Sequence, residues 1–368
     1  MGLTIFTTVI SKGGLIMNNG QNHSPAFFES LVSGFGHNVK RFRILMRFKK
    51  DSKNLNPFSV IVSKEISDHV RSWRFLILIV IIALTCLGSL YTALTNIDKA
   101  VKPGDPAGTF FFLKLFTISD GSLPSFFVFI GFLGPLLGIS LGFDAVNSEQ
   151  NNGTLSRILA QPIYRDYVLN AKFLAALTVI SVMFFALGFL VLGIGLITIG
   201  IPPTPEEFLR IVSFIALSII YVAFWLNLSI LFSVRFRQPA TSALSGIAIW
   251  LFFSVFYRMI VGLIGKAFAP SQFAPAYQVI GFEELKIGLL RLMPNQLFSE
   301  ATTTLLMPSV RSLGPLTMEQ VYGTLPGPLP LSQSLLLVWP QVTGLVAATV
   351  LCFVLSYISF MRREIRSR

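Results

Sequence analysis

Few side chains in this sequence could carry out chemistry of their own. The three histidines, His23, His37 and His69, stand at no metal-ligand spacing. Cys86 and Cys352 both lie inside apolar runs, which indicates neither a disulfide framework nor a thiolate metal site. No G-x-x-x-x-G-K-[ST] phosphate-binding loop occurs, so the chain does not bind ATP by that device. The residue types therefore disfavour a catalytic role.

Two polar side chains inside apolar segments could still have a function. Arg258 is the only charged residue well inside such a segment, and a charge within a membrane indicates a functional site by default. It lies within about two turns of the segment's end, however, where an arginine can also snorkel to the surface. Both interpretations of Arg258 stay open. We interpret Asn227 as an interhelical hydrogen-bonding group rather than a substrate ligand.

A run of small residues marks one apolar segment. Gly131, Gly134, Gly138 and Gly142 recur every three or four residues, with Pro135 among them. Overlapping G-x-x-x-G spacing lets two helices approach closely, and a proline can kink a helix. The pattern fits static packing within the chain, and it also fits a kinked helix at a moving interface beside a pathway through the membrane.

The elements that position these residues are membrane spans. The chain has 368 residues, of which 53% are hydrophobic and 12% are charged. A soluble domain carries roughly twice that charged fraction. Six apolar segments reach the roughly 20 residues that a bilayer requires. They cover about residues 75–94, 125–146, 169–199, 208–234, 240–264 and 335–360. We therefore predict an all-α integral membrane protein with six transmembrane helices.

The remaining parts of the chain flank these spans. Residues 1–55 form a basic tail, interpreted either as a helix on anionic headgroups or as a solvated segment. Residues 56–74 predict an amphipathic helix that lies in the membrane interface and leads into the first span. Residues 75–361 form the six-span domain, with a long outer loop at 265–334. Residues 362–368 form a second basic tail.

The distribution of charge predicts the orientation. One set of loops, together with both termini, holds 20 Lys and Arg residues, and the opposite loops hold 8. By the positive-inside rule both termini are cytoplasmic, in a protein of the cell membrane. The net charge of +12 is then a matter of topology, which disfavours nucleic-acid binding.

The polar stretch from Asp144 to Lys172 has more internal order than a connector needs. Asn152-Gly153 predicts a turn, and Thr154 predicts the N-cap of a short helix over residues 155–160. Pro162 prevents that helix from continuing. A short stiff helix held between two spans at the aqueous boundary could transmit force.

From about residue 58 to 361 the chain resembles a permease subunit of the ABC-2 type, the membrane half of an ABC exporter. The interfacial helix, the six spans and the long outer segment fit this family, and the polar stretch is the most specific part. The residues that match the family's order are Asp144, Glu149, Gly153, Thr154, Leu155, Pro162, Arg165 and Lys172. Gln150 to Asn152 depart from the pattern, because the family often has charge there. Within the family the chain is most similar to the group that contains the copper-associated permease of nitrous-oxide-reductase maturation, a likeness that assigns no substrate.

The resemblance implies a type V exporter-like fold and a division of labour between subunits. A separate P-loop ABC ATPase would hold ATP and magnesium, this chain would bind no cofactor, and residues 155–160 would be the coupling helix. Arg157 and Arg165 would meet acceptors on the ATPase, while Leu155, Ile158 and Leu159 would fill a groove. A second permease subunit, identical or different, would complete the assembly, and spans two and five would line an export path.

Two other function classes stay open. The first is an ABC-like membrane anchor or mechanotransmission subunit, which would use the ATPase to change shape without moving a substrate. The second is a membrane-embedded enzyme, which the absence of an intramembrane acid, base, nucleophile or metal cluster disfavours. The sequence does not identify a substrate.

Overall fold

The computed structural model describes residues 56–100, 110–119, 121, 123–271, 274–315 and 327–363. The chain divides into two compact units, residues 1–55 and 56–368, and every described residue belongs to the second. The predicted basic tail at 1–55 and the last five residues lie outside the described residues.

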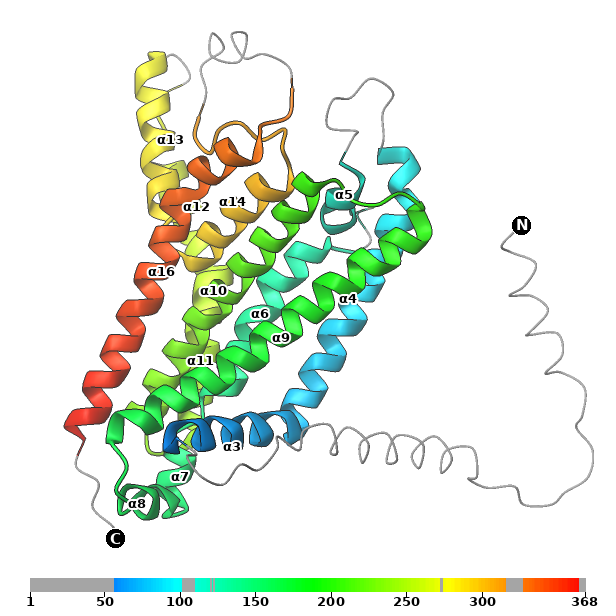
Figure 1. Cartoon of the computed structure of the whole chain (residues 1–368). Helices are drawn as coiled ribbons and strands as arrows, with labels where there is room; N and C mark the ends of the chain where they lie inside the picture. Colours follow the sequence, from blue (N-terminus) through cyan, green and yellow to red (C-terminus); the bar gives the residue numbers. More distant parts are fainter. Residues whose placement is uncertain are drawn as a thin grey trace, which may run out of the picture. The chain divides into compact units, whose positions relative to one another are not determined.

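The regular secondary structure of the described residues is entirely helical (Figure 1). In chain order the helices are α3 (Pro57–Arg71), α4 (Trp73–Ala100), α5 (Phe111–Thr117), α6 (Phe126–Gly142), α7 (Asn147–Asn151), α8 (Thr154–Leu159), α9 (Arg165–Ile199), α10 (Pro205–Arg235), α11 (Pro239–Leu251), the π-helix η2 (Phe252–Phe256), α12 (Tyr257–Ala267), α13 (Ala276–Leu290), α14 (Pro294–Leu306) and α16 (Leu331–Arg362).

Within the described residues, six stretches of helix are long and apolar enough to cross a membrane, which confirms the predicted number of spans. They run over Trp73–Asn96, Phe126–Asn151, Arg165–Ile199, Pro205–Arg235, Pro239–Ala267 and Leu331–Arg362. The third begins four residues before the predicted start and continues the polar loop directly into the membrane as helix. The fifth contains a π-helical turn, η2, that the apolar pattern alone does not predict.

The amphipathic helix before the first span is α3. Its first turn is capped by Asn56, whose side-chain oxygen accepts a hydrogen bond from the Phe58 backbone N–H at 3.2 Å, and Pro57 occupies the first helical position. Ser72 then separates α3 from α4. Figure 1 shows α3 lying across the ends of the long helices, beside α7 and α8. We call this end of the bundle the α8 end.

The centre of the bundle is α10, which packs against α6, α9, α14 and α16. Tyr221 and Trp225 on α10 are fully buried. A Cβ added to Gly138 of α6 would lie 2.7 Å from the Val222 carbonyl oxygen, and one added to Gly142 would lie 2.8 Å from that of Leu226. The glycine spacing therefore lets α6 rest directly on the backbone of α10.

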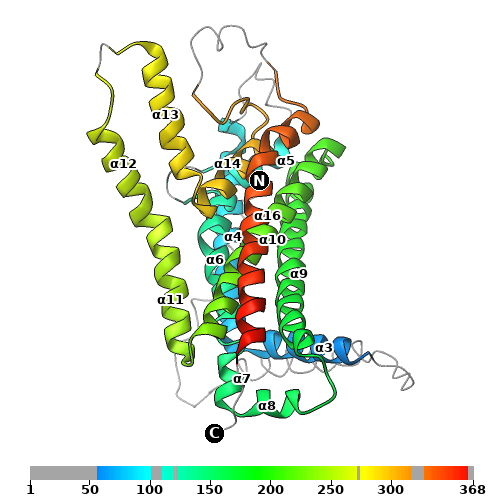
Figure 2. The ribbon, with the colours of Figure 1, turned by 90° about the vertical axis from the view of Figure 1, so that its left-hand side faces the viewer.

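The fifth span stands apart from this packed centre. Only 11% of its apolar window is buried within the chain, against 61% for α10. Figure 2 shows α12 standing away from the central helices with α13 beside it, and α11 returning toward the centre at the α8 end. The exposed side chains along α11, η2 and α12 are mostly large and apolar, as in Leu244, Val255 and Leu263. A span of this kind needs lipid or another protein beside it.

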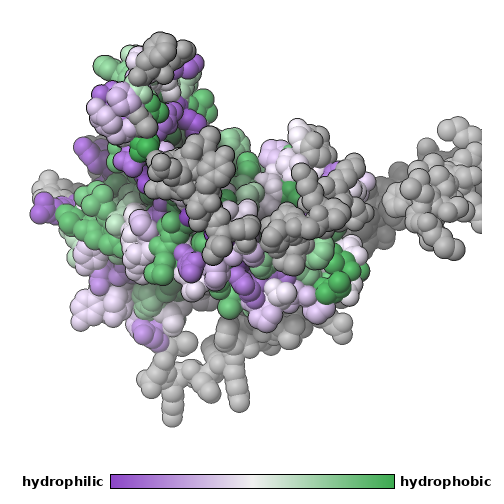
Figure 3. Space-filling view, turned by 90° about the horizontal axis from the view of Figure 1, so that it is seen from above, coloured by the Kyte–Doolittle hydropathy of each residue, from purple (hydrophilic) through white to green (hydrophobic). Residues whose placement is uncertain are grey.

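The opposite end of the bundle carries α5, α13 and α14, and we call it the α13 end. Viewed from above, its surface mixes hydrophilic and hydrophobic residues (Figure 3). α5 packs into the bundle there, with Phe112, Leu115 and Phe116 buried. The carboxylate of Glu207 on α10 accepts a hydrogen bond from the Phe112 backbone N–H at 2.9 Å, which fixes the start of α5.

Candidate functional site

The loop from α6 to α9 folds into two short helices joined by a tight turn. Gly153 adopts φ +67°, a left-handed conformation that favours glycine, as the Asn-Gly pair predicts. Gly153 itself, rather than Thr154, is the N-cap of α8. The predicted cap is therefore wrong by one residue, because the Thr154 hydroxyl instead donates to the Glu149 carbonyl oxygen at 3.1 Å. α8 ends at Leu159, before Pro162.

Four charged residues from three helices meet at the base of this loop. Lys172 Nζ on α9 lies 3.0 Å from Glu65 Oε2 on α3 and 2.9 Å from Glu149 Oε1 on α7. Lys64 Nζ lies 2.9 Å from Glu65 Oε1 and 3.3 Å from Glu149 Oε1. We call Lys64, Glu65, Glu149 and Lys172 the four-residue ion network. It joins the loop to α3 and α9.

The ion network is buried in its centre and open on one side. The Lys172 side chain is 4% exposed and that of Glu65 is 9% exposed, whereas Lys64 is half exposed. Burial alone would raise the pKa of the Glu65 carboxyl, but Lys172 and Lys64 outweigh it and hold that pKa below its ordinary value. A charge pair this well buried resists separation, because removing either partner leaves an uncompensated charge.

Further contacts fasten the same loop. Arg74 Nη2 at the start of α4 lies 2.7 Å from Asp144 Oδ2 and stacks over the Phe143 ring. The Ser233 hydroxyl on α10 accepts hydrogen bonds from the backbone N–H groups of Val146 and Asn147, at 2.9 and 3.2 Å. Asp144 therefore pairs within the chain, and the loop is attached to α4 and α10 as well.

The orientation of α8 corrects one prediction. Leu155 is 2% exposed, so its side chain packs inside this chain and does not fill a partner's groove. Ile158 and Leu159 are half-buried against the same core. Arg157 and Pro162 are exposed. The surface that α8 offers to a partner is thus more polar than the apolar residues of its sequence indicate.

Arg165 is engaged within the chain. Its Nη2 donates to the Arg363 carbonyl oxygen at 2.9 Å, and its guanidinium lies over the Phe360 ring. It therefore joins the start of α9 to the end of α16, rather than extending from the tip of the loop.

Asn227 and Arg258, the two polar residues predicted inside the spans, lie outside the α7–α8 loop. Asn227 is buried, and its Nδ2 donates to the Thr349 carbonyl oxygen at 3.3 Å, which is the predicted link between two helices. Arg258 is exposed on α12, and its Nη2 donates to Gln296 Oε1 on α14 at 3.1 Å. Neither residue contacts the ion network.

The glycine-rich face of α6 lies against α10 and α14. A Cβ on Gly134 would lie 2.9 Å from Val222 Cγ2, and one on Gly131 would lie 3.4 Å from the Phe298 ring. Pro135 is buried within an unbroken helix. These contacts are the static packing that the spacing predicts, and the alternative of a moving interface stays a prediction.

Sequence reasoning missed Arg210, a fully buried charge at the α13 end. Its Nη1 donates to the Leu305 carbonyl oxygen at 3.0 Å and to Ser334 Oγ at 3.2 Å, and its Nη2 pairs with Glu206 Oε1 at 2.9 Å. Arg210 thus joins α10 to α14 and α16. The Glu206–Arg210 spacing of four residues was a signal for the ion pair, but nothing local indicates complete burial.

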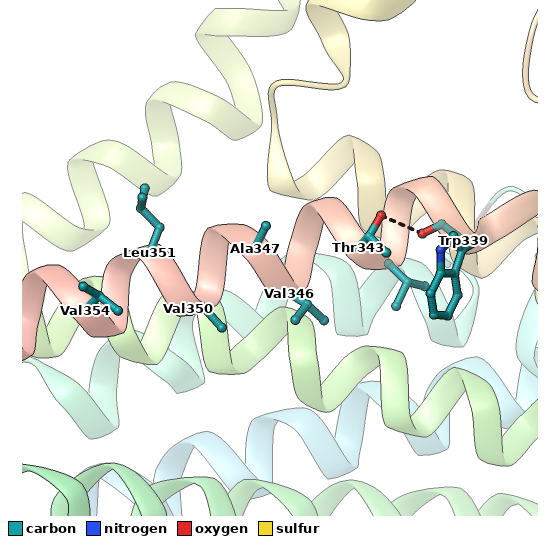
Figure 4. A pocket seen from close by; sticks show the side chains of 8 residues that line it. Trp339, Thr343, Val346, Ala347, Val350, Leu351 and Val354 are labelled. Carbon is teal, nitrogen blue, oxygen red and sulfur yellow. Dashed lines mark hydrogen bonds between the residues drawn. The ribbon is translucent and has the colours of Figure 1, made fainter.

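Other places in the described residues offer less chemistry. No group of three or more His, Cys, Asp or Glu side chains there could hold a metal ion. A groove runs along one face of α16, lined mostly by aliphatic side chains such as Val346, Val350 and Val354 (Figure 4). The Thr343 hydroxyl in this groove donates to the Trp339 carbonyl oxygen of its own helix at 3.0 Å. The groove suits hydrocarbon and has no group placed for catalysis.

Comparison with known proteins adds one positive finding. A family model described as ABC-2 family transporter protein matches residues 59–365, a range that contains all six spans, most of α3 and the whole α7–α8 loop. No curated protein matches the chain.

Proposed function

Since the chain belongs to the ABC-2 family of transporter proteins, we propose that it is the permease subunit of an ATP-binding cassette transporter whose ATPase is a separate polypeptide. The observation that carries this proposal is the attachment of the α7–α8 loop to α3 and α9 through the four-residue ion network. A loop held in this way moves together with the helices that cross the membrane.

The proposed coupling begins at the exposed side of α8. The ATPase contacts Arg157 and the turn around Pro162, and its closure displaces α8. Glu149 transfers the displacement to Lys172, because separating this buried pair is costly. Lys172 lies on a helix of 35 residues that runs without interruption across the bundle, so the displacement reaches the α13 end.

The assembly follows from the same premise. ATP and magnesium are held by the ATPase, and two permease subunits, identical or different, lie side by side in the bilayer. The exposed apolar surface of the fifth span supports such a neighbour. Spans two and five line the transport path. The α8 end is cytoplasmic, because the Lys and Arg residues are concentrated on that side. The direction of transport is export. The family match covers the family as a whole and does not select the nitrous-oxide-reductase group, so no substrate is assigned.

A single surface charge on α8 tests the coupling contact. The permease is co-expressed with a P-loop ATPase encoded beside it, and Arg157→Glu is compared with Arg71→Glu, an exposed basic position on α3 at the same end. We expect R157E to lose ATPase co-purification at least tenfold while R71E does not. Equal co-purification and equal ATPase stimulation in both variants would place the contact elsewhere.

A flux assay separates transport from the alternative of a non-translocating anchor. The assembly is reconstituted in vesicles, and ATP-dependent release of candidate substrates is measured alongside ATP turnover. Turnover that depends on Arg157 but moves no substrate would support the anchor function.

A further inference from the structure

Four arginines lie at the α8 end of the bundle, where α9 begins and α10 and α16 end. Arg165 begins α9, Arg235 ends α10, Arg237 follows it, and Arg363 follows α16. Arg165 donates to the Arg363 carbonyl oxygen at 2.9 Å, and Arg363 in turn donates to the carbonyl oxygen of Val234. Val234 precedes Arg235 in the chain, so the Arg363 side chain reaches the end of α10, and burial together with the positive charges of Arg237 and Arg235 lowers the pKa of Arg363. We call the four residues the arginine cluster.

The arginine cluster differs from the three cations that fasten the α7–α8 loop to the bundle. Lys64, Arg74 and Lys172 each have a carboxylate oxygen within the distance of an ion pair. Among the described residues, no carboxylate forms such a pair with any member of the arginine cluster. The fold therefore gathers positive charge from three helices, and the part of the chain that is described does not neutralise it.

The arginine cluster also contains an unpartnered hydrogen-bond donor and two exposed side chains. Arg165 Nε is buried and has no hydrogen-bond partner, and the side chains of Arg235 and Arg237 are exposed. A guanidinium presents five N–H donors in a planar fork that matches phosphate oxygens in pairs. Several guanidinium groups gathered at one end of the bundle without a carboxylate partner are suited to a phosphate group.

The position of the arginine cluster favours a lipid over a protein as its binding partner. Figure 1 shows the end of α16 and the start of α9 at the level of α3, with α7 and α8 extending beyond them. The arginine cluster thus lies where the spans end, which is the level of the headgroups, and not at the tip of the loop. Exposed apolar side chains of α16, among them Val350, Val354 and Ile358, continue to within a few residues of Arg363 and offer a surface for acyl chains.

We propose that Arg165, Arg235, Arg237 and Arg363 bind the phosphodiester headgroup of an anionic phospholipid in the leaflet at the α8 end. Phosphate oxygens accept from the unpaired guanidinium donors, and the negative charge relieves the repulsion among the four cations. This lipid site does not depend on the proposed transport function, because it rests on contacts away from the α8 tip.

The test uses the full-length protein in lipid nanodiscs and native mass spectrometry to count retained lipids. Wild type is compared with Arg235→Gln/Arg237→Gln, which removes two exposed charges of the arginine cluster. The matched control is Arg71→Gln/Lys266→Gln, which removes two exposed charges elsewhere. Phosphatidylglycerol is titrated into phosphatidylcholine discs, and inorganic phosphate and glycerol phosphate are added in separate arms.

The expected result is a higher half-saturating phosphatidylglycerol fraction for the arginine-cluster variant, by roughly fivefold for each arginine removed. The control variant should stay within twofold of wild type, and the soluble phosphates should not displace the lipid. Equal lipid retention in both variants would overturn the proposal. Full displacement by inorganic phosphate would assign the arginine cluster to a free anion instead. Loss of ATPase co-purification in R235Q/R237Q with unchanged lipid retention would assign it to the protein partner.

Discussion

Lys172 and Glu149 form an ion pair of 2.9 Å between the two ends of the polar loop, and Glu65 from a different helix also pairs with Lys172, at 3.0 Å. Both loop residues belong to the residue order by which the chain resembles its family. Their proximity gives a physical reason for this residue order, because the ion pair attaches the base of the loop to α9, the helix that follows it. Glu65 extends the same attachment to α3.

Replacing Lys172 with Met should destabilise the protein. The change keeps the volume of the side chain but leaves Glu65 and Glu149 buried with only Lys64 as a counter-charge. We expect a loss of about 3 kcal/mol, at the low end of the cost of breaking a buried pair. Thermal unfolding in detergent measures it, and Glu65→Gln combined with Lys172→Met should recover part of the loss. An unchanged midpoint for K172M would show that the network contributes no stability.

The lowered pKa of Glu65 predicts acid sensitivity with a definite sign. A carboxyl whose folded-state pKa lies below its ordinary value of 4.5 contributes stability above that value and loses it as the pH falls through the folded-state pKa. The contribution of Glu65 to the attachment of α3 should therefore be constant from pH 7 to about 5 and weaken in more acidic solution. Labelling of a cysteine placed at Ile66, which packs against the core, reports the attachment.

Two variants test whether Glu65 is the group whose protonation weakens the attachment of α3 below about pH 5, a change that we call the acid step. Glu65→Gln should abolish it, whereas Asp68→Asn, at an exposed carboxylate of the same helix, should preserve it. An acid step of equal size in E65Q would assign the titration to another group.

Close packing of α6 on α10 makes Gly138 sensitive to the smallest side chain. An added Cβ would lie 2.7 Å from the Val222 carbonyl oxygen and 2.9 Å from the Leu226 nitrogen, and backbone atoms cannot move aside cheaply. Gly138→Ala should cost about 1–3 kcal/mol by overpacking. Gly193→Ala on α9 is the control, because nothing lies within 4 Å of its added Cβ, and it should be neutral or slightly stabilising. Equal unfolding midpoints for the two variants would contradict the packing described for α6.

The sequence predicts those features that depend on local pattern. Apolar length predicts the six spans, the Asn-Pro pair predicts the start of α3, and the Asn-Gly pair predicts the turn at Gly153. Features that depend on distant contacts are missed. The burial of Leu155 depends on how α8 rotates against the bundle, and the burial of Arg210 depends on α14 and α16 closing over it. Neither contact can be predicted from the residues that neighbour Leu155 or Arg210 in the sequence.

Because Leu155 is buried and Arg157 is exposed, substitutions at these two positions distinguish destabilisation of the α7–α8 loop from loss of ATPase binding. Leu155→Asp places a charge in the core, so it should loosen the α7–α8 loop and increase its cleavage by protease. R157E, at an exposed position of the same helix, should leave cleavage unchanged even where ATPase binding is lost. Limited proteolysis of the purified permease distinguishes the two, and equal protection of L155D and wild type would show that the side chain is not buried.

Cysteine labelling tests the orientation that the charge distribution predicts. Asn152 in the loop and Tyr277 on α13 are exposed at opposite ends of the bundle, so each accepts a cysteine without disturbing the core. In a background without Cys86 and Cys352, Asn152→Cys should react with a membrane-impermeant maleimide only after the cells are opened. Tyr277→Cys should react in intact cells. These outcomes follow from the excess of Lys and Arg on the side of Asn152. The reverse pattern would place the α8 end outside the cell, where no ATP-driven partner could reach it, and labelling of both positions from one side would contradict the six-span topology.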